Sequence, residues 1–175
     1  MKLQKIHETI LYILLMAKEN GTGDLSKFQI VKLLYLIQIE SLKFTGRPFI
    51  NNLSFFREKN GPLSADIYYA INDLKDSYIS ITTVNNEAYG YSKEAHSLLN
   101  KKVSFTLTDS EILFLRSVLS DYLTLTQAKL KDITYKTEPM VEITSKETNG
   151  NILRKMLDYG SVPLDKDVAE SFAGI

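Results

Sequence analysis

The chain has 175 residues, enough for one domain with a core of its own, and its 21 basic residues balance its 21 acidic ones. This balance disfavours a surface that is basic overall and follows phosphates, although a local basic patch is compatible with it. The absence of cysteine excludes disulfides, thiolate zinc sites and cysteine nucleophiles.

No uncharged apolar run approaches the roughly 20 residues that span a bilayer. The start of the chain is also a poor signal peptide, because His7 and Glu8 follow two early lysines. We therefore expect a cytoplasmic protein with no membrane contact, organised as a single domain over residues 1–175.

Residues 3–19 predict a first helix, with apolar side chains at helical spacing and a turn at residues 20–23. His7 lies near the apolar face of this helix. No second histidine or carboxylate stands at metal-ligand spacing from His7, so we interpret it as an ordinary histidine that is partly buried or at the surface.

Residues 26–44 predict the central helix of the fold. The segment is apolar over most of its circumference, which indicates burial on several sides. Ser26 is a suitable N-cap, and Gly46 can adopt the left-handed conformation that ends a helix. Lys32 lies in the narrow polar stripe, where it either lines a groove or is solvated or paired internally.

Residues 53–101 predict a series of short helices and extended segments. Residues 53–59 predict an extended stretch, residues 60–62 a sharp break, and Ser64 the cap of a helix that ends near Asp76. Residues 78–92 predict a hairpin with its turn at residues 85–87, and residues 93–101 a short helix with His96 at the surface.

The C-terminal part predicts further helices. A capping box formed by Thr108 and Glu111 begins one that ends near Leu123, and Thr126 begins another that ends near Thr134. Pro139 suits the start of a short helix, residues 149–150 a turn, residues 152–159 a helix, and residues 166–172 a last short turn. The fold class is therefore mainly α with a small β-hairpin (α+β): a compact helical domain around a central buried helix.

Signatures of catalysis are missing from the sequence. It has no phosphate-binding glycine loop with a lysine, dinucleotide fingerprint, paired-histidine zinc motif or nucleophile elbow. Asp73 and Asp76 share helical spacing, but nothing near them in sequence would separate their pKa values. We expect no enzymatic activity, cofactor or metal, and an enzyme that uses Arg57 or Lys59 is the weakest hypothesis.

A helix followed by a hairpin also suggests a winged-helix-like element, and hence a DNA-binding regulator. The helix at residues 64–76 carries three aspartates and one lysine, and the hairpin at residues 78–92 has no basic residue. Because affinity for DNA depends on basic side chains at the phosphates, this composition disfavours DNA binding.

Several motifs together resemble one family. The sequence IVKLLYL at residues 30–36 is similar to the KLLYF helix of the Panacea domain of SocA-like antitoxins and phage-associated proteins. GRPF follows at residues 46–49, and FFREKNGPLS at residues 55–64 resembles the family element F-x-R-x-K-Y-G-P-x-S. Residues 107–111 and 125–134 match the paired C-terminal helices, so the resemblance covers about residues 5–172.

The sequence departs from the family pattern at three positions. Asn60 replaces the usual tyrosine, Tyr135 stands where a histidine is common, and Met140 where a tryptophan is common. If these side chains form a shared surface in relatives, that surface and its partner differ here.

The resemblance implies an antitoxin of a bacterial or prophage toxin–antitoxin pair, which neutralises its cognate toxin by direct protein binding. It also implies a possible role as an adaptor that delivers the toxin to a cytosolic protease. The residues we expect to contact the partner are Lys32, Arg57, Lys59, Asn60 and Tyr135, because loop residues beside a sharp turn tend to carry recognition. The sequence leaves the identity of the toxin and the oligomeric state open.

Overall fold

The computed structural model describes residues 2–86, 91–99, 102–148 and 154–165 of the chain. Within these residues it contains the helices α1 (Lys5–Glu19), α2 (Lys27–Thr45), α3 (Ala65–Leu74), α4 (Asp109–Tyr122), α5 (Gln127–Tyr135) and α6 (Glu138–Ser145), and the short 3-10 helix η2 (Tyr159–Ser161). The strands are β1 (Leu25–Ser26), β2 (Phe56–Glu58), β3 (Gly61–Leu63), β4 (Ile79–Asn86) and β5 (Tyr91–Leu98). The mainly helical α+β class predicted from the sequence is confirmed.

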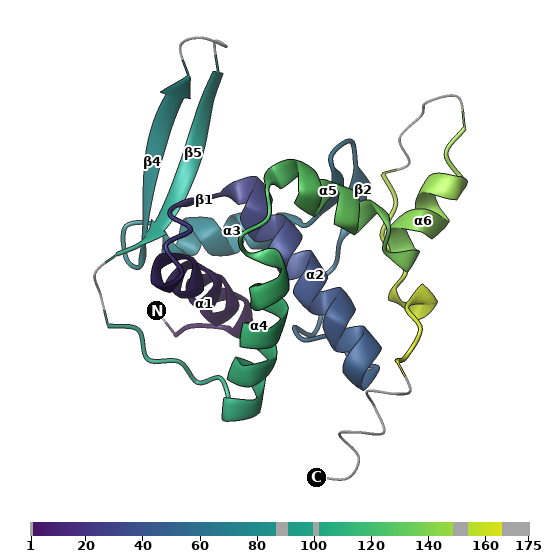
Figure 1. Ribbon diagram of the computed structural model, residues 1–175, viewed down its shortest axis with the longest axis horizontal. Helices are drawn as coiled ribbons and strands as arrows, with labels where there is room; N and C mark the ends of the chain where they lie inside the picture. The colour runs from purple at the N-terminus through teal and green to yellow at the C-terminus, as the bar shows by residue number, and fades with distance from the viewer. Residues whose placement is uncertain (1, 87–90, 100–101, 149–153, 166–175) are drawn as a thin grey trace.

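Helix α2 runs through the middle of the molecule, with α1, α4 and α5 packed around it (Figure 1). Its start and end follow the sequence prediction: the Ser26 hydroxyl accepts a hydrogen bond from the Gln29 amide, and Gly46 is left-handed at φ 68°. Eight of its apolar side chains are almost completely buried: Ile30, Val31, Leu33, Leu34, Tyr35, Leu36, Ile37 and Ile39. The prediction of a helix buried on several sides is confirmed.

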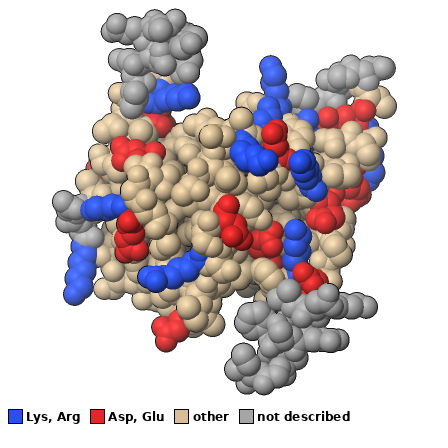
Figure 2. Space-filling model, viewed as in Figure 1, with Lys and Arg blue, Asp and Glu red and all other residues tan. Residues whose placement is uncertain are grey.

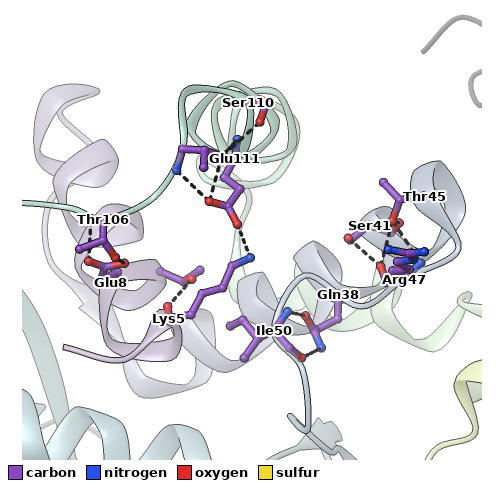
Figure 3. Close-up of polar contacts among 12 residues, drawn as sticks. Lys5, Glu8, Gln38, Ser41, Thr45, Arg47, Ile50, Thr106, Ser110 and Glu111 are labelled. Atoms are coloured by element: carbon purple, nitrogen blue, oxygen red, sulfur yellow. Dashed lines mark hydrogen bonds and ion pairs between the residues drawn. The ribbon is translucent and has the colours of Figure 1, made fainter. Parts of the chain in front are cut away.

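Three polar anchors hold neighbouring segments in place, and Figure 3 shows them. The Glu8 carboxylate of α1 accepts hydrogen bonds from the Thr106 amide (2.7 Å) and hydroxyl (3.0 Å). The Gln38 side chain bonds both the amide of Ile50 (2.7 Å) and its carbonyl (3.0 Å). Lys5 pairs with Glu111 of α4. Buried polar groups thus fix the loops that enter and leave the helical core.

The first sheet has the strand order β1-β5-β4 and is antiparallel throughout. Together with α3 it forms the winged-helix-like helix–hairpin element, and the hairpin extends away from the helices (Figure 1). The helix predicted at residues 93–101 is wrong, because residues up to Leu98 pair with β4 over its whole length. The predicted turn residues 85 and 86 lie in β4, and residue 87 is outside the described residues.

The prediction that His96 lies at the surface is also wrong. The side chain is fully buried between β1 and β4, and its Nδ1 lies 3.1 Å from the Leu25 carbonyl oxygen. Burial lowers the pKa of His96 below its usual value. The imidazole thus ties the two-residue strand β1 to the hairpin.

The second sheet is the small hairpin β2–β3. The sharp break predicted at residues 60–62 is the turn of this hairpin at residues 59–60, and Gly61 and Pro62 already belong to β3, where they pair with Glu58 and Arg57. The other edge of β2 is covered by residues 155–157, where Phe56 bridges Met156 and the Arg57 amide donates to the Lys155 carbonyl at 2.9 Å. These bonds require an extended backbone, so the predicted helix at 152–159 is wrong over 154–158, while residues 152 and 153 lie outside the described residues.

The C-terminal helices follow their predicted starts. Thr108 and Glu111 form the capping box of α4, the Thr126 hydroxyl accepts from the Lys129 amide, and Pro139 stands in the first turn of α6. The turn predicted at residues 149–150 and the last turn at 166–172 lie outside the described residues. No helix in the described segments is both long enough and apolar enough to cross a membrane.

Candidate functional site

The five residues expected to contact a partner come together at the turn of the β2–β3 hairpin, although they are up to 103 positions apart in sequence. The hairpin turn lies against both α2 and α5. Gly61 has φ +93°, and a Cβ placed on it would lie 3.2 Å from Lys32 Nζ, 3.2 Å from Tyr135 Cε2 and 3.4 Å from Thr134 Oγ1. Only glycine allows this backbone conformation together with so close an approach. We call this surface the turn face: Lys32, Arg57, Lys59, Asn60, Lys131 and Tyr135.

Lys32 forms the buried floor of the turn face. Its side chain is 2% exposed, and Nζ donates a hydrogen bond of 2.6 Å to the carbonyl of Pro62. Of the two roles left open by the sequence, internal pairing is therefore the observed one, and the acceptor is neutral. Burial, together with the positive charges of Lys131 and Arg57, lowers the Lys32 pKa to about 7.

Arg57 and Tyr135 form one wall of the turn face. Arg57 Nε lies 2.7 Å from the carboxylate of Glu147, and Nη2 donates to the same carboxylate at 3.1 Å. The guanidinium carbon is 5.1 Å from the centre of the Tyr135 ring, a cation–π distance. Arg57 is only 6% exposed, so it orients Tyr135 and leaves little of its own charge at the surface.

Lys59, Asn60 and Lys131 form the outer rim. Lys59 and Asn60 are exposed at the hairpin turn, and the Lys59 carbonyl accepts a hydrogen bond of 3.0 Å from the Tyr135 hydroxyl. Lys131 Nζ donates to Asn60 Oδ1 at 3.2 Å and lies 5.8 Å from the centre of the Tyr135 ring. The rim therefore presents the Lys131 ammonium near the Tyr135 ring and an exposed lysine, Lys59, whose backbone bonds the Tyr135 hydroxyl.

The turn face has more positive than negative charge. Glu147 neutralises Arg57, but no carboxylate of the described residues forms an ion pair with Lys32, Lys59 or Lys131. Figure 2 shows Lys and Arg side chains gathered over α5 and the adjoining turn. A cationic surface with an aromatic centre suits an anionic group better than an apolar or cationic one.

Lys131 and Glu147 were not among the residues predicted from the sequence. Lys131 precedes Tyr135 by four residues on α5, and this spacing, which places both on one helix face, is a signal that could have identified it. Glu147 reaches Arg57 only through the fold. Of the three departures from the family pattern, Asn60 and Tyr135 belong to the turn face, whereas Met140 is fully buried in the core.

Two hollows elsewhere on the molecule contain none of the predicted residues. A groove of about 670 Å³ between the end of α2 and the start of α4 is lined mainly by Phe44, Phe49 and Phe114. A second hollow, of about 550 Å³, lies between α1, residues 50–53 and α3. No group of three or more acidic or histidine side chains suited to a metal ion occurs among the residues that the structure describes.

Fold and site together define a helical α+β domain whose distinctive surface is a charged, rigidly supported turn. A family model described as antitoxin SocA-like, Panacea domain, matches residues 30–139, more than half of the chain and a range that includes all of the turn face. The chain belongs to this family of antitoxin-like Panacea domains. Neither the comparison with curated proteins nor that with solved structures found a match.

Proposed function

We propose that this protein is the antitoxin of a bacterial or prophage toxin–antitoxin pair and that it neutralises its toxin by direct contact in the cytoplasm. Membership of the SocA-like Panacea family supports the general role and a toxin as partner. The observation that supports this surface as the contact is the convergence at the turn face of five residues from the family's motif positions, two of which, Asn60 and Tyr135, depart from the family pattern. A non-enzymatic role agrees with the family.

The turn face has properties that suit a protein contact. Its backbone is fixed by the β2–β3 pairing and by Gly61 against α2 and α5, so little conformational entropy is lost when a partner binds. Tyr135 and the arginine beneath it belong to the residue types enriched in protein interfaces. The exposed Lys59 and Asn60 would then select the partner around this centre.

The test is co-expression of the tagged protein with the product of each neighbouring gene in its genome. We expect one product to arrest growth alone, to allow growth with this protein, and to co-purify with it in a fixed ratio. If no neighbouring product binds or is neutralised, the antitoxin role is contradicted.

A second measurement separates the two modes that the family resemblance leaves open. If the antitoxin blocks its toxin, the toxin persists in cells as part of the complex. If it delivers the toxin to a cytosolic protease, the half-life of the toxin falls when the antitoxin is present, and loss of the protease restores it. We favour blocking as the primary mode, because the turn face offers a preformed surface.

A further inference from the structure

We propose that the turn face recognises a carboxylate-bearing segment of the partner, with an aspartate or glutamate side chain placed between Lys59 and Lys131. This inference rests on the proposed function and adds the chemistry of the group that is bound. Its basis is a positive charge that the described residues of the chain leave without counterions.

The first argument is the rim. Lys59 is exposed and Lys131 is partly buried. Among the described residues, the polar contact of the Lys131 ammonium is the neutral amide oxygen of Asn60 at 3.2 Å. Elsewhere on the surface lysines do find carboxylates, for example Lys27 with Glu94 at 2.9 Å and Lys146 with Glu142 at 2.6 Å. The rim lysines are thus available to an incoming carboxylate without first breaking an ion pair.

The second argument is the floor. Lys32 is a nearly fully buried amine that bonds a neutral carbonyl, and the charged groups that lower its pKa, Lys131 and Arg57, are positive. The Glu147 carboxylate is bound to Arg57. Below about pH 7, where the Lys32 amine carries its proton, this buried cation raises the local potential, and interactions there are screened less than in bulk water. A carboxylate over the turn is then stabilised by Lys32 as well as by the two rim lysines.

The third argument separates a protein carboxylate from a nucleic-acid phosphate. A duplex presents a phosphate every few ångströms and is bound along an extended basic track. At the rim, however, Glu58 precedes Lys59 and pairs with Arg154 at 3.2 Å, and the exposed Asp132 follows Lys131. The basic residues are thus interrupted by carboxylates rather than arranged as a continuous track, whereas a single acidic side chain needs only the two rim lysines.

The test uses the full-length protein and the partner captured by co-purification. A zero-length carbodiimide joins a lysine amine to a carboxylate in contact with it, and mass spectrometry identifies the pair. We expect cross-links from Lys59 or Lys131 to an aspartate or glutamate of the partner. In the double variant Lys59→Arg/Lys131→Arg, which keeps the charge but lacks the reactive amine, these cross-links should disappear while the affinity stays within about threefold.

Charge reversal gives the matching energetic result. The double variant Lys59→Glu/Lys131→Glu should weaken binding by at least about tenfold at low salt, with a smaller loss at high salt. The control, Lys75→Glu/Lys102→Glu, makes the same change in net charge at two exposed lysines outside the turn face and should stay within about threefold. Circular dichroism and thermal unfolding check that each variant is folded.

The outcomes are distinguishable. If the wild-type protein captures no partner, the proposed function fails. If it captures a partner that gives no cross-link at these lysines and tolerates their reversal, the function stands and this inference is overturned. Salt-sensitive binding of a mixed-sequence DNA duplex that is lost in the charge-reversed variant, without a protein partner, would overturn it in favour of a nucleic-acid site.

Discussion

The buried ammonium of Lys32 links the stability of the fold to pH. Its pKa is about 7 in the folded protein and about 10.5 in the unfolded chain, so between these values the unfolded chain binds more protons. The free energy of unfolding should therefore rise as the pH is raised above 7, by up to about 1 kcal/mol per pH unit. Below pH 7 both states carry the proton, and this contribution to the pH dependence ends.

The variant Lys32→Met isolates this effect, because methionine fills a similar volume without titrating. We expect the wild type to gain stability relative to Lys32→Met between pH 7 and 9, measured by urea denaturation at several pH values. Parallel curves for the two proteins over this range would show that Lys32 keeps its proton in the folded state.

Gly61 is the second residue on which the turn face depends. In Gly61→Ala the new Cβ lies 3.2 Å from Lys32 Nζ and from Tyr135 Cε2. The alanine backbone must also adopt φ +93°. We expect a loss of roughly 2–4 kcal/mol in the free energy of unfolding, from backbone strain and displaced neighbours together.

Gly21→Ala is the matched control for this substitution. Gly21 also has a positive φ, +67°, but a Cβ there meets nothing within 4 Å. This variant should therefore lose only the backbone term, roughly 1 kcal/mol. Equal losses in the two variants, measured by chemical denaturation, would mean that the turn does not press on α2 and α5 as described.

Among the described elements, the two-residue strand β1 pairs with β5, and the His96 imidazole adds a side-chain contact to the Leu25 carbonyl. Because burial lowers the pKa of His96 in the folded state, the unfolded chain takes up the proton first when the pH falls below about 6.5. The stability of the wild type should consequently fall between pH 6.5 and 5.

His96→Gln keeps a nitrogen donor for the Leu25 carbonyl but does not titrate in this range. We expect the difference in unfolding free energy between wild type and variant to change with pH from 6.5 to 5, in the direction of a relative loss for the wild type. A difference that is constant over this range would contradict a buried neutral His96.

The elements also show which parts of the fold can be predicted from the sequence. Helices α2, α4 and α5 were predictable because their caps and apolar spacing are local signals: Ser26, Thr108 and Thr126 each cap the helix that follows. Residues 93–98 of β5 are predicted as a helix but form strand, since their pairing with β4 and β1 outweighs the local preference of the segment. The extended segment at residues 154–158 was missed for the same reason, because its partner, Phe56, is far away in sequence.

The candidate site likewise has a part that is predictable from local sequence and a part that depends on the fold. Arg57, Lys59 and Asn60 are neighbours in sequence beside a turn, so their proximity was predictable. That Lys32 lies beneath them and Tyr135 beside them depends on how α2 and α5 pack against the hairpin. The partner of Arg57, Glu147, is 90 residues away, and no local pattern indicates it.

At the scale of the whole molecule, α2 is the central element of the core. It packs against α1, α4, α5 and β3, and the hydroxyl of its Tyr35 lies 2.7 Å from that of Thr137, just before α6. Opening α2 therefore requires disruption of the entire core.

Native-state hydrogen exchange tests this arrangement. The amides of residues 30–39 should exchange only by global unfolding, with a free energy equal to that from chemical denaturation. Amides near the exposed part of β4, at residues 82 and 83, should exchange through smaller openings. Exchange of α2 well below the global free energy would show that the protein consists of separately opening parts.

The position of α2 also has a consequence for synthesis. A ribosome releases the N-terminal part of a chain first. Here the long apolar helix is made early, but its buried polar groups find their partners later: Lys32 bonds the Pro62 carbonyl, and Tyr35 bonds the Thr137 hydroxyl. The first third of the protein therefore lacks the residues of α5 that complete the turn face. The turn face is assembled only after α5 has emerged from the ribosome. On the proposed function, the protein becomes competent to bind its partner only once the chain through Tyr135 has been made, and chains cut short before α5 should expose α2 and be recognised as unfolded.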